Sequence, residues 1–159
     1  MADREKVALQ PEPTLDQEVF LELMRTHEAY DTEAARFFKT FEVTAQQFNV
    51  LRILYVRGDG PGIACSQISK HLLNRVPDMT RLLDRLERAG LVERERCSSD
   101  RRVVRARLTA KGHTLVERIH EPLLAMHERL TGHLDATEGR ELIRLLQKAR
   151  TTGSRRSAA

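Results

Sequence analysis

The sequence predicts a mainly α-helical protein with one small β-hairpin, an α+β chain in which helices dominate. Three observations lead to this prediction. Apolar residues recur at three- and four-residue steps through most of the chain, as the buried face of a helix requires. Between residues 91 and 108 the spacing changes to alternation, as in a pair of strands. Residues that start and stop helices flank each helical stretch.

The N-terminal part is expected to form one long amphipathic helix. Thr14 or Asp16 can cap its start, and its apolar pattern continues over roughly 25 positions. A helix of this length either lies over the core of its own chain or packs on a partner subunit. We assign residues 14–42 to a dimerisation helix and residues 1–13 to a flexible arm. This face comprises Val19, Phe20, Leu23, His27, Tyr30, Phe37, Phe38 and Phe41.

Shorter elements follow this helix. Thr44 begins a capping box, so a second helix is expected to start there and to end at the glycine-rich turn 58–62. Residues 63–64 are long enough for a brief strand beside the hairpin. Ser66 is expected to cap a short helix beginning at Gln67. In a helix-turn-helix, this short helix braces the next one across the DNA backbone.

The next helix has one apolar face and one polar, arginine-rich face. Pro77 suits a first helical turn, where the backbone N–H is not needed. Gly90 follows the last turn, where a left-handed residue commonly ends a helix. The apolar face comprises Met79, Leu82, Leu83 and Leu86.

A β-hairpin is expected directly after this helix. Residues 91–96 and 103–108 alternate as strands, and the polar segment 97–102 connects them. A helix followed at once by an arginine-tipped hairpin can enter two grooves of duplex DNA. The helix fits the major groove, and the loop reaches the adjacent minor groove. This order of elements therefore favours binding to double-stranded DNA.

The charge distribution supports this interpretation. Residues 74–107 hold ten arginines and six acidic residues, a net charge of +4. The whole chain has 27 basic and 23 acidic residues and the same net charge, so the excess lies in this segment. All basic residues of the segment are arginines, whose planar fork suits phosphates and guanine edges. The alternative is a solvated helix and hairpin that charge keeps soluble.

Two further helices are expected near the C-terminus. Thr109 can cap the first, and Asp135 begins a capping box that starts the second. Their apolar faces exceed what a small DNA-binding lobe needs, so residues 111–150 are assigned to dimerisation. Residues 151–159 form a basic tail, which is expected to be disordered. The face of the last helix, expected to be buried, comprises Leu142, Leu145, Leu146 and Ala149.

A combination of motifs resembles a known family. T-R-L-L-D-R-L-E-x-x-G-L-V-x-R spans residues 80–94, D-R-R follows at 100–102, and L-T-x-x-G follows at 108–112. Together they resemble the core of the MarR-type winged-helix transcription regulators, and a weaker resemblance extends over residues 15–149. The resemblance implies a winged helix-turn-helix lobe at residues 43–110. It also implies a homodimer that binds a pseudopalindromic operator, most often as a repressor.

By the resemblance, the arginine-rich helix that begins near Pro77 is the recognition helix, and the residues at its start contact base edges. Arginine at a guanine edge is the commonest specific pairing, so Arg81 is the first choice. Asp78 either accepts from a cytosine amino group or stabilises the N-terminus of the helix. The expected contacts are Val76, Pro77, Asp78, Thr80, Arg81 and Arg85, with Ser66 and Gln67 from the brace helix.

The hairpin tip matches the D-x-R of the family's wing. Asp100 stands two residues before Arg102 and can hold its guanidinium in one pose. Arg102 is then expected to enter the minor groove, with Arg101 beside it. Alternatively, Asp100 stabilises a turn by bonding its own backbone. Arg94 and Arg96 of the first strand complete the predicted wing surface.

An effector is implied only by the resemblance. Such regulators usually bind a small aromatic or anionic molecule between the dimerisation helices and the DNA-binding lobe. The aromatic residues expected to line this pocket are Tyr30, Phe37, Phe38 and Phe48.

Several other functions find little support in the sequence. No nucleophile elbow, glycine-rich phosphate loop or paired metal ligands appear, so neither an enzyme nor a cofactor is expected. The chain has no tryptophan and few aromatic residues, which argues against a single-strand binder that stacks bases. No apolar run reaches the roughly 20 residues of a membrane span. The start, M-A-D-R-E-K-V-A, lacks a signal-peptide core, which predicts a cytoplasmic location.

Three alternatives stay open. Cys65 or Cys97 could sense an oxidant, which would require a lowered thiol pKa. His113 and Glu117 lie one helical turn apart and could share a regulatory metal, although no metal site is assigned. The chain could also be a winged-helix module that binds proteins and has lost DNA binding.

Overall fold

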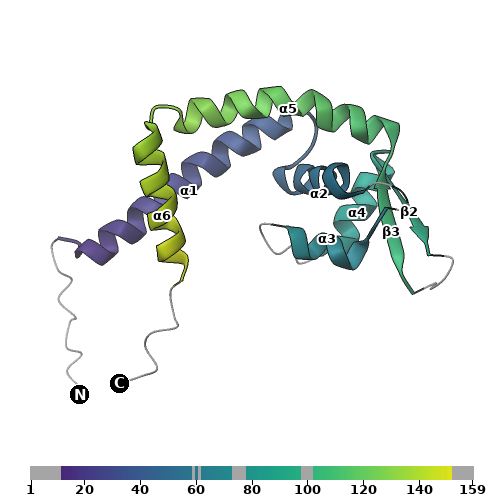
Figure 1. Cartoon of the computed structure of the whole chain (residues 1–159), viewed down its shortest axis with the longest axis horizontal. Helices are drawn as coiled ribbons and strands as arrows, with labels where there is room; N and C mark the ends of the chain where they lie inside the picture. Colours follow the sequence, from purple (N-terminus) through teal and green to yellow (C-terminus); the bar gives the residue numbers. More distant parts are fainter. Residues whose placement is uncertain (1–11, 59, 61, 73–77, 98–101, 152–159) are drawn as a thin grey trace, which may run out of the picture.

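The computed structural model describes residues 12–58, 60, 62–72, 78–97 and 102–151. Six helices and three strands lie in these ranges (Figure 1). In chain order they are α1 (Leu15–Lys39), α2 (Ala45–Arg57), β1 (Ile63–Ala64), α3 (Cys65–His71), α4 (Met79–Arg88), β2 (Val92–Arg96), β3 (Val104–Leu108), α5 (Ala110–Thr131) and α6 (Ala136–Arg150).

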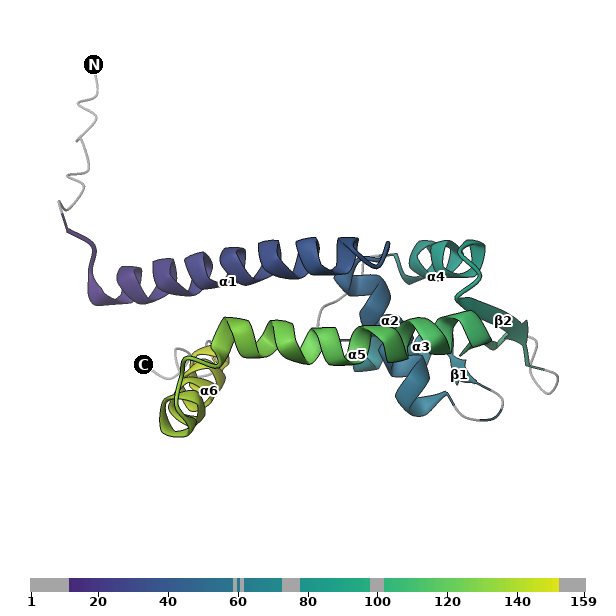
Figure 2. The same ribbon diagram turned by 90° about the horizontal axis from the view of Figure 1, so that it is seen from above.

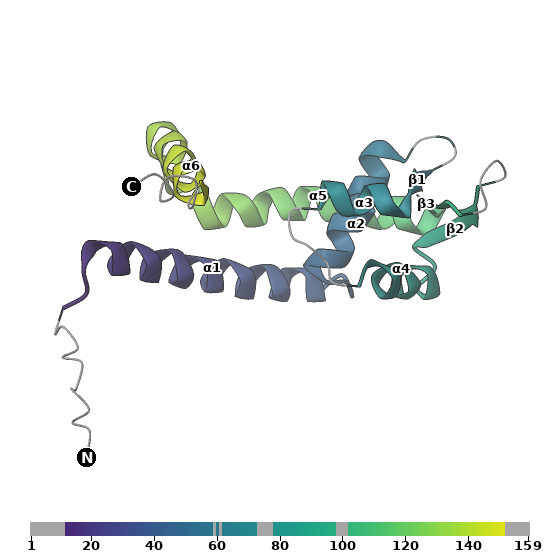
Figure 3. The ribbon, with the colours of Figure 1, turned by 90° about the horizontal axis from the view of Figure 1, so that it is seen from below.

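The chain forms a lobe from which two long helices extend. Helices α2, α3 and α4 and the sheet make up the lobe, and α1 and α5 run side by side away from it (Figures 1 and 2). The hydroxyl of Tyr30 in α1 donates to the backbone carbonyl of Leu130 in α5 at 3.2 Å. Helix α6 follows α5 at the end farthest from the sheet (Figure 3). The predicted mainly helical fold with a β-hairpin is therefore confirmed.

The sheet is antiparallel with the strand order β1-β3-β2. Val92 pairs with Leu108 and Arg96 with Val104, which makes β2 and β3 the predicted hairpin. Ile63 pairs with Ala106, so the expected brief strand lies on the opposite edge of β3.

Capping explains most helix starts. The capping boxes expected at Thr44 and Asp135 are both present, and a third one at Thr14 starts α1. The expected cap at Ser66 is wrong, because β1 continues directly into α3 and Ala64 takes the cap position without a side-chain hydrogen bond. Ser66 consequently lies inside the first turn.

Helix α4 begins at Met79 and ends as predicted. Asp78 caps its start, so the helix begins two residues after Pro77, which lies outside the described residues. Gly90 has a φ of +69°, the left-handed conformation that glycine adopts without strain. Its N–H donates to Glu87, and that of Leu91 donates to Leu86, which closes the last turn.

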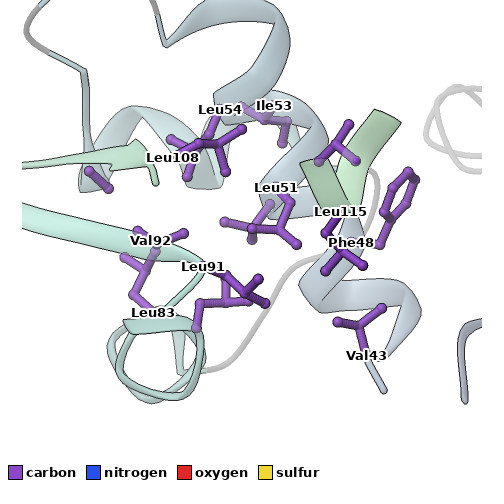
Figure 4. Close-up of a cluster of buried hydrophobic side chains, with 14 of the residues drawn as sticks. Val43, Phe48, Leu51, Ile53, Leu54, Leu83, Leu91, Val92, Leu108 and Leu115 are labelled. Carbon is purple, nitrogen blue, oxygen red and sulfur yellow. The ribbon is translucent and has the colours of Figure 1, made fainter. Parts of the chain in front are cut away.

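One hydrophobic core joins the lobe to the first half of α5. Leu51 and Leu54 of α2, Leu83 and Leu86 of α4 and Ile119 of α5 are fully buried in it. Figure 4 shows these helices and the sheet directing aliphatic side chains into a common interior. The apolar face of α4 is therefore turned inward, which leaves its polar face outside.

The outer apolar helix faces are not buried within one chain. Leu15, Phe20 and Ile143 expose 73%, 61% and 57% of their surface. None of the residues 136–150, all of which the structure describes, is buried. The expectation that the face of α6 is buried is therefore wrong for a single chain, because α6 lies beyond the lobe. Its exposed members include Leu142, Leu145, Leu146 and Ala149.

Candidate nucleic-acid interface

The N-terminus of α4 is organised by Asp78. Its carboxylate accepts the backbone N–H of Arg81 at 3.0 Å and caps the helix. The other carboxylate oxygen lies 2.9 Å from Nε of Arg81, whose side chain remains 80% exposed. Of the two roles left open for Asp78, the structure shows helix capping, and it adds the orientation of Arg81.

The polar face of α4 points to solvent. Thr80, Arg81, Arg85 and Arg88 are exposed on it, while Leu82, Leu83 and Leu86 are buried on the opposite side. Of the predicted base-contacting residues, Val76 and Pro77 lie outside the described part of the chain. Ser66 and Gln67 are exposed in the first turn of α3. The described contact residues of α3 and α4 are therefore exposed, and Ser66 of α3 and Thr80 of α4 line the same surface hollow.

The wing is described on both sides of its tip. Arg96 at the end of β2 and Arg102 before β3 are exposed. Asp100 and Arg101 lie outside the described residues, so the geometry of the D-x-R pair remains a prediction. Arg107 forms an ion pair with Glu93 across the hairpin at 2.8 Å, and Arg105 donates to the carbonyl of Gly62 at 2.9 Å.

Arg94 has ion-pair partners that the charge count did not indicate. Its Nη2 lies 2.5 Å from carboxylate oxygens of both Asp84 and Glu87, and its Nε donates to Glu87 at 3.0 Å. The Arg94 side chain is only 22% exposed, and its guanidinium bridges β2 to α4. The hydrogen bond from Arg94 holds the pKa of Glu87 below its ordinary value. We call these three residues the Arg94 clamp.

A second link joins α4 to α5. Nζ of Lys111 donates to the carbonyl of Ala89 at 2.8 Å, and the hydroxyl of Thr109 donates to Gly90 at 2.7 Å. The N–H of Thr109 also donates to Leu91 at 3.1 Å. Three consecutive carbonyls after α4 are thus bound by the start of α5, and we call this arrangement the carbonyl latch. Its only sequence signal is the L-T-x-x-G motif.

The expected aromatic pocket is not assembled as proposed. Phe38 and Phe48 pack against each other at 5.0 Å between ring centroids and belong to the hydrophobic core. Phe37 packs on Phe38, whereas Tyr30 lies seven residues earlier in α1 and contacts Leu130 of α5. A cavity of about 310 Å³ lies instead between residues 41–43, which follow α1, the end of α4 and α5. Its lining includes Phe41, Val43, Leu91, Lys111, Thr114 and Arg118.

The structure argues against activation of the Cys65 thiol. Cys65 and Cys97 are both half-buried and form no disulfide. Burial raises the pKa of the Cys65 thiol, although the charge of nearby Arg94 opposes this effect. A raised pKa reduces the thiolate fraction, which makes Cys65 a poor oxidant sensor.

The pair His113 and Glu117 is occupied by other contacts. Glu117 accepts a hydrogen bond from the hydroxyl of Tyr55 at 3.3 Å, and the ring of His113 lies 5.5 Å from that of Tyr55. The negative charge of Glu117 raises the pKa of Tyr55. Within the described ranges, no three metal-ligating side chains come close enough to hold an ion. No helix of the described chain is both long and apolar enough to cross a membrane.

Comparisons with known proteins identify the family of this chain. Residues 43–104, which contain the helix-turn-helix and most of the hairpin, match the model described as MarR family. The transcriptional regulator PecS of Dickeya dadantii is 35% identical over 112 residues, which cover 69% of this chain and 68% of PecS. The chain belongs to the MarR family.

Solved MarR-family structures share this arrangement. A MarR transcription factor from Planctomyces limnophilus is 44% identical, with a TM-score of 0.66 over 86% of this chain and 98% of its own. MepR of S. aureus, solved as a complex with DNA, is 27% identical, with a TM-score of 0.74 over 89% and 100%. The family consists of transcription regulators rather than enzymes, as predicted.

Proposed function

We propose that this MarR-family chain is a homodimeric repressor that binds a pseudopalindromic operator in duplex DNA and responds to a small effector. One observation carries the proposal: α4 buries its leucine face and turns Thr80, Arg81 and Arg85 outward. Helix α4 and the β2–β3 wing lie next to each other at the same end of the molecule (Figure 1). This arrangement suits a helix in the major groove and a wing in the adjacent minor groove.

The apolar surfaces of α1 and α6 support a dimer. An apolar groove lined by Leu23, Ile143, Leu146 and Ala149 lies between these helices. Contiguous exposed apolar side chains of this kind usually mark a protein interface. A second copy of the chain would cover both helices at once and present two copies of α4. Paired recognition helices separated by about one turn of DNA read a pseudopalindrome.

The cavity between α5 and the lobe is where we place the effector. Arg118 and Lys111 supply two positive charges against the single carboxylate of Glu42, and the guanidinium of Arg118 lies 5.6 Å from the centre of the Phe41 ring. Val43, Leu91 and Leu115 provide apolar walls. These groups suit a small molecule that combines an anionic group with an apolar or aromatic body. Such an effector would act by binding one dimer state more tightly than the other.

A selection of genomic DNA tests the proposal. The purified protein is mixed with fragmented genomic DNA, retained fragments are sequenced, and binding is titrated against a random fragment of equal length. We expect one or a few fragments with inverted half-sites, bound as a dimer with strongly salt-dependent affinity. Absent or salt-insensitive binding would favour the alternative of a winged-helix module that binds proteins.

A further inference from the structure

We propose that Arg94 is a positioning residue for DNA recognition, which clamps the wing onto the recognition helix through Asp84 and Glu87 and does not itself bind DNA. The inference rests on the proposed function, since it concerns how the same surface reaches two grooves together. It also changes the role expected for Arg94, which the sequence placed among the DNA-facing arginines of the wing.

The orientation of Arg94 follows from the alternation of β2. Val92 is buried against the core, and Arg94 lies two residues farther along, on the same face of the strand. Glu93 and Glu95 are exposed on the other face. Arg94 is therefore directed towards α4, at the point where the apolar contact between strand and helix ends.

The carboxylates opposite Arg94 are spaced to receive it. Asp84 and Glu87 are three residues apart in α4, which places them on one side of the helix. Asp84 accepts from Nη2, and Glu87 accepts from both Nη2 and Nε. A single guanidinium thus contacts two points of α4 and fixes rotation of the helix relative to the strand. A flexible lysine ammonium would not impose this planar geometry.

The clamp also controls the charge on the DNA-facing side of the lobe. Asp84 and Glu87 are 37% and 40% exposed, so without a partner they would repel phosphates. Arg94 has little capacity left for a phosphate, because its guanidinium bonds to both carboxylates and its side chain is only 22% exposed. The wing contains a contrasting pair, Glu93 and Arg107, which are each 50% exposed and connect only β2 to β3.

Substitution of the two carboxylates distinguishes positioning from simple charge. Asp84→Asn with Glu87→Gln removes two negative charges near the predicted interface, which Coulomb's law alone predicts will tighten DNA binding. Loss of the clamp predicts the opposite, a loss of affinity of about tenfold for the genomic fragment selected by the wild type. The matched control, Glu93→Gln with Glu95→Gln, removes the same charge from the other face of β2. It should bind equally well or slightly more tightly.

Arg94→Met supplies an independent measurement. An arginine that contacts a phosphate contributes about 0.9 to the slope of log affinity against log salt. The variant should bind the selected fragment about tenfold more weakly. Added to Arg102→Ala, in which the wing contact is already removed, Arg94→Met should leave the slope unchanged, because Arg94 itself contacts no phosphate. In a double-mutant cycle, Arg102→Ala should cost less affinity in the Arg94→Met background than in the wild type, because the wing is no longer held. A purely stabilising role for Arg94 would lower the melting temperature and leave the two losses additive.

Each outcome is decisive. Equal or tighter binding by the carboxylate variant would overturn the clamp, and so would a slope that falls by about a further 0.9 when Arg94→Met is added to Arg102→Ala. Arg94→Lys keeps the positive charge but loses the planar guanidinium, so its affinity should lie between those of Arg94→Met and the wild type. Wild-type affinity in Arg94→Lys would contradict the geometric argument. If the wild type retained no fragment, the proposed function would fail first. If it bound and the carboxylate variant bound as well, only this inference would fail.

Discussion

Nζ of Lys111 donates a hydrogen bond to the carbonyl oxygen of Ala89 at a distance of 2.8 Å. Ala89 is the C-terminal cap of α4, and Lys111 lies in the first turn of α5. The recognition helix is therefore tied directly to the helix that extends towards α6. A movement of α5 in a dimer would be transmitted to α4 through the carbonyl latch and through the shared core.

Gly112 lies next to the carbonyl latch, and its substitution tests how closely α5 packs against the carbonyl of Leu91. A Cβ at Gly112 would lie 2.2 Å from the carbonyl oxygen of Leu91, so we expect Gly112→Ala to lower the free energy of unfolding by about 1–3 kcal/mol. Gly139 in α6 is a matched control, because a Cβ there meets nothing within 4 Å. Gly139→Ala should instead raise the free energy of unfolding by about 0.5–1 kcal/mol. Urea unfolding of both variants measures these changes. Changes in the free energy of unfolding that have the same sign in the two variants would contradict the prediction.

The clamp predicts a pH dependence of stability. The hydrogen bond from Arg94 lowers the pKa of Glu87 below its ordinary value of 4.5 in the folded chain. Stabilisation by Glu87 is then complete above the unfolded pKa and disappears as pH falls through the lowered folded value. The wild type should exceed Glu87→Gln in unfolding free energy by at most about 1 kcal/mol at neutral pH, since the pair is partly exposed. The difference should shrink below about pH 4.5 and be absent in an Arg94→Met background. Chemical denaturation at several pH values measures it.

The exposed apolar face of α6 predicts a variant that separates assembly from folding. Ile143 is 57% exposed in one chain, so Ile143→Glu should leave the lobe folded while placing a charge in the proposed dimer interface. We expect sedimentation to show a shift from dimer to monomer and the circular dichroism of the helices to be largely kept. Unchanged dimerisation would place the interface elsewhere.

The position of Arg81 predicts its role in sequence reading. Its side chain is held by Asp78 and is largely exposed at the start of α4. Arg81→Ala should cost about 1–3 kcal/mol on the selected fragment and relax the sequence preference. Gel-shift titrations on selected and random DNA measure both effects. Equal losses on the two DNAs would show that Arg81 contacts the backbone rather than a base edge.

Local chemistry made much of the fold predictable. The capping boxes at Thr44 and Asp135 and the left-handed Gly90 start or stop helices where the sequence indicates. Ser66 was misplaced because a strand directly precedes α3, and no local pattern announces that continuity. The helical spacing of apolar residues identified the apolar face of α6. Such spacing cannot tell whether the face is covered by the same chain or by another chain.

The candidate site was less predictable than the fold. The charge count identified an arginine-rich segment, but it could not separate the exposed Arg81 from the clamped Arg94. One sequence signal could have separated them: alternation along the strand places Arg94 on the same face as the apolar Val92, and therefore towards the helix rather than towards DNA. The aromatic pocket failed because Phe38 and Phe48 are needed in the core, and aromatic residues are more often core than ligand contacts.

The most direct test of DNA binding is a salt titration of the selected genomic fragment with wild type and Arg102→Ala. Arg102 is exposed at the described edge of the wing. If α4 and the wing grip duplex DNA together, the wild-type affinity should fall steeply and linearly with log salt. Arg102→Ala should bind more weakly, with a slope reduced by about 0.9. Identical slopes for the two proteins would contradict the minor-groove role of the wing, and a flat wild-type slope would contradict DNA binding itself.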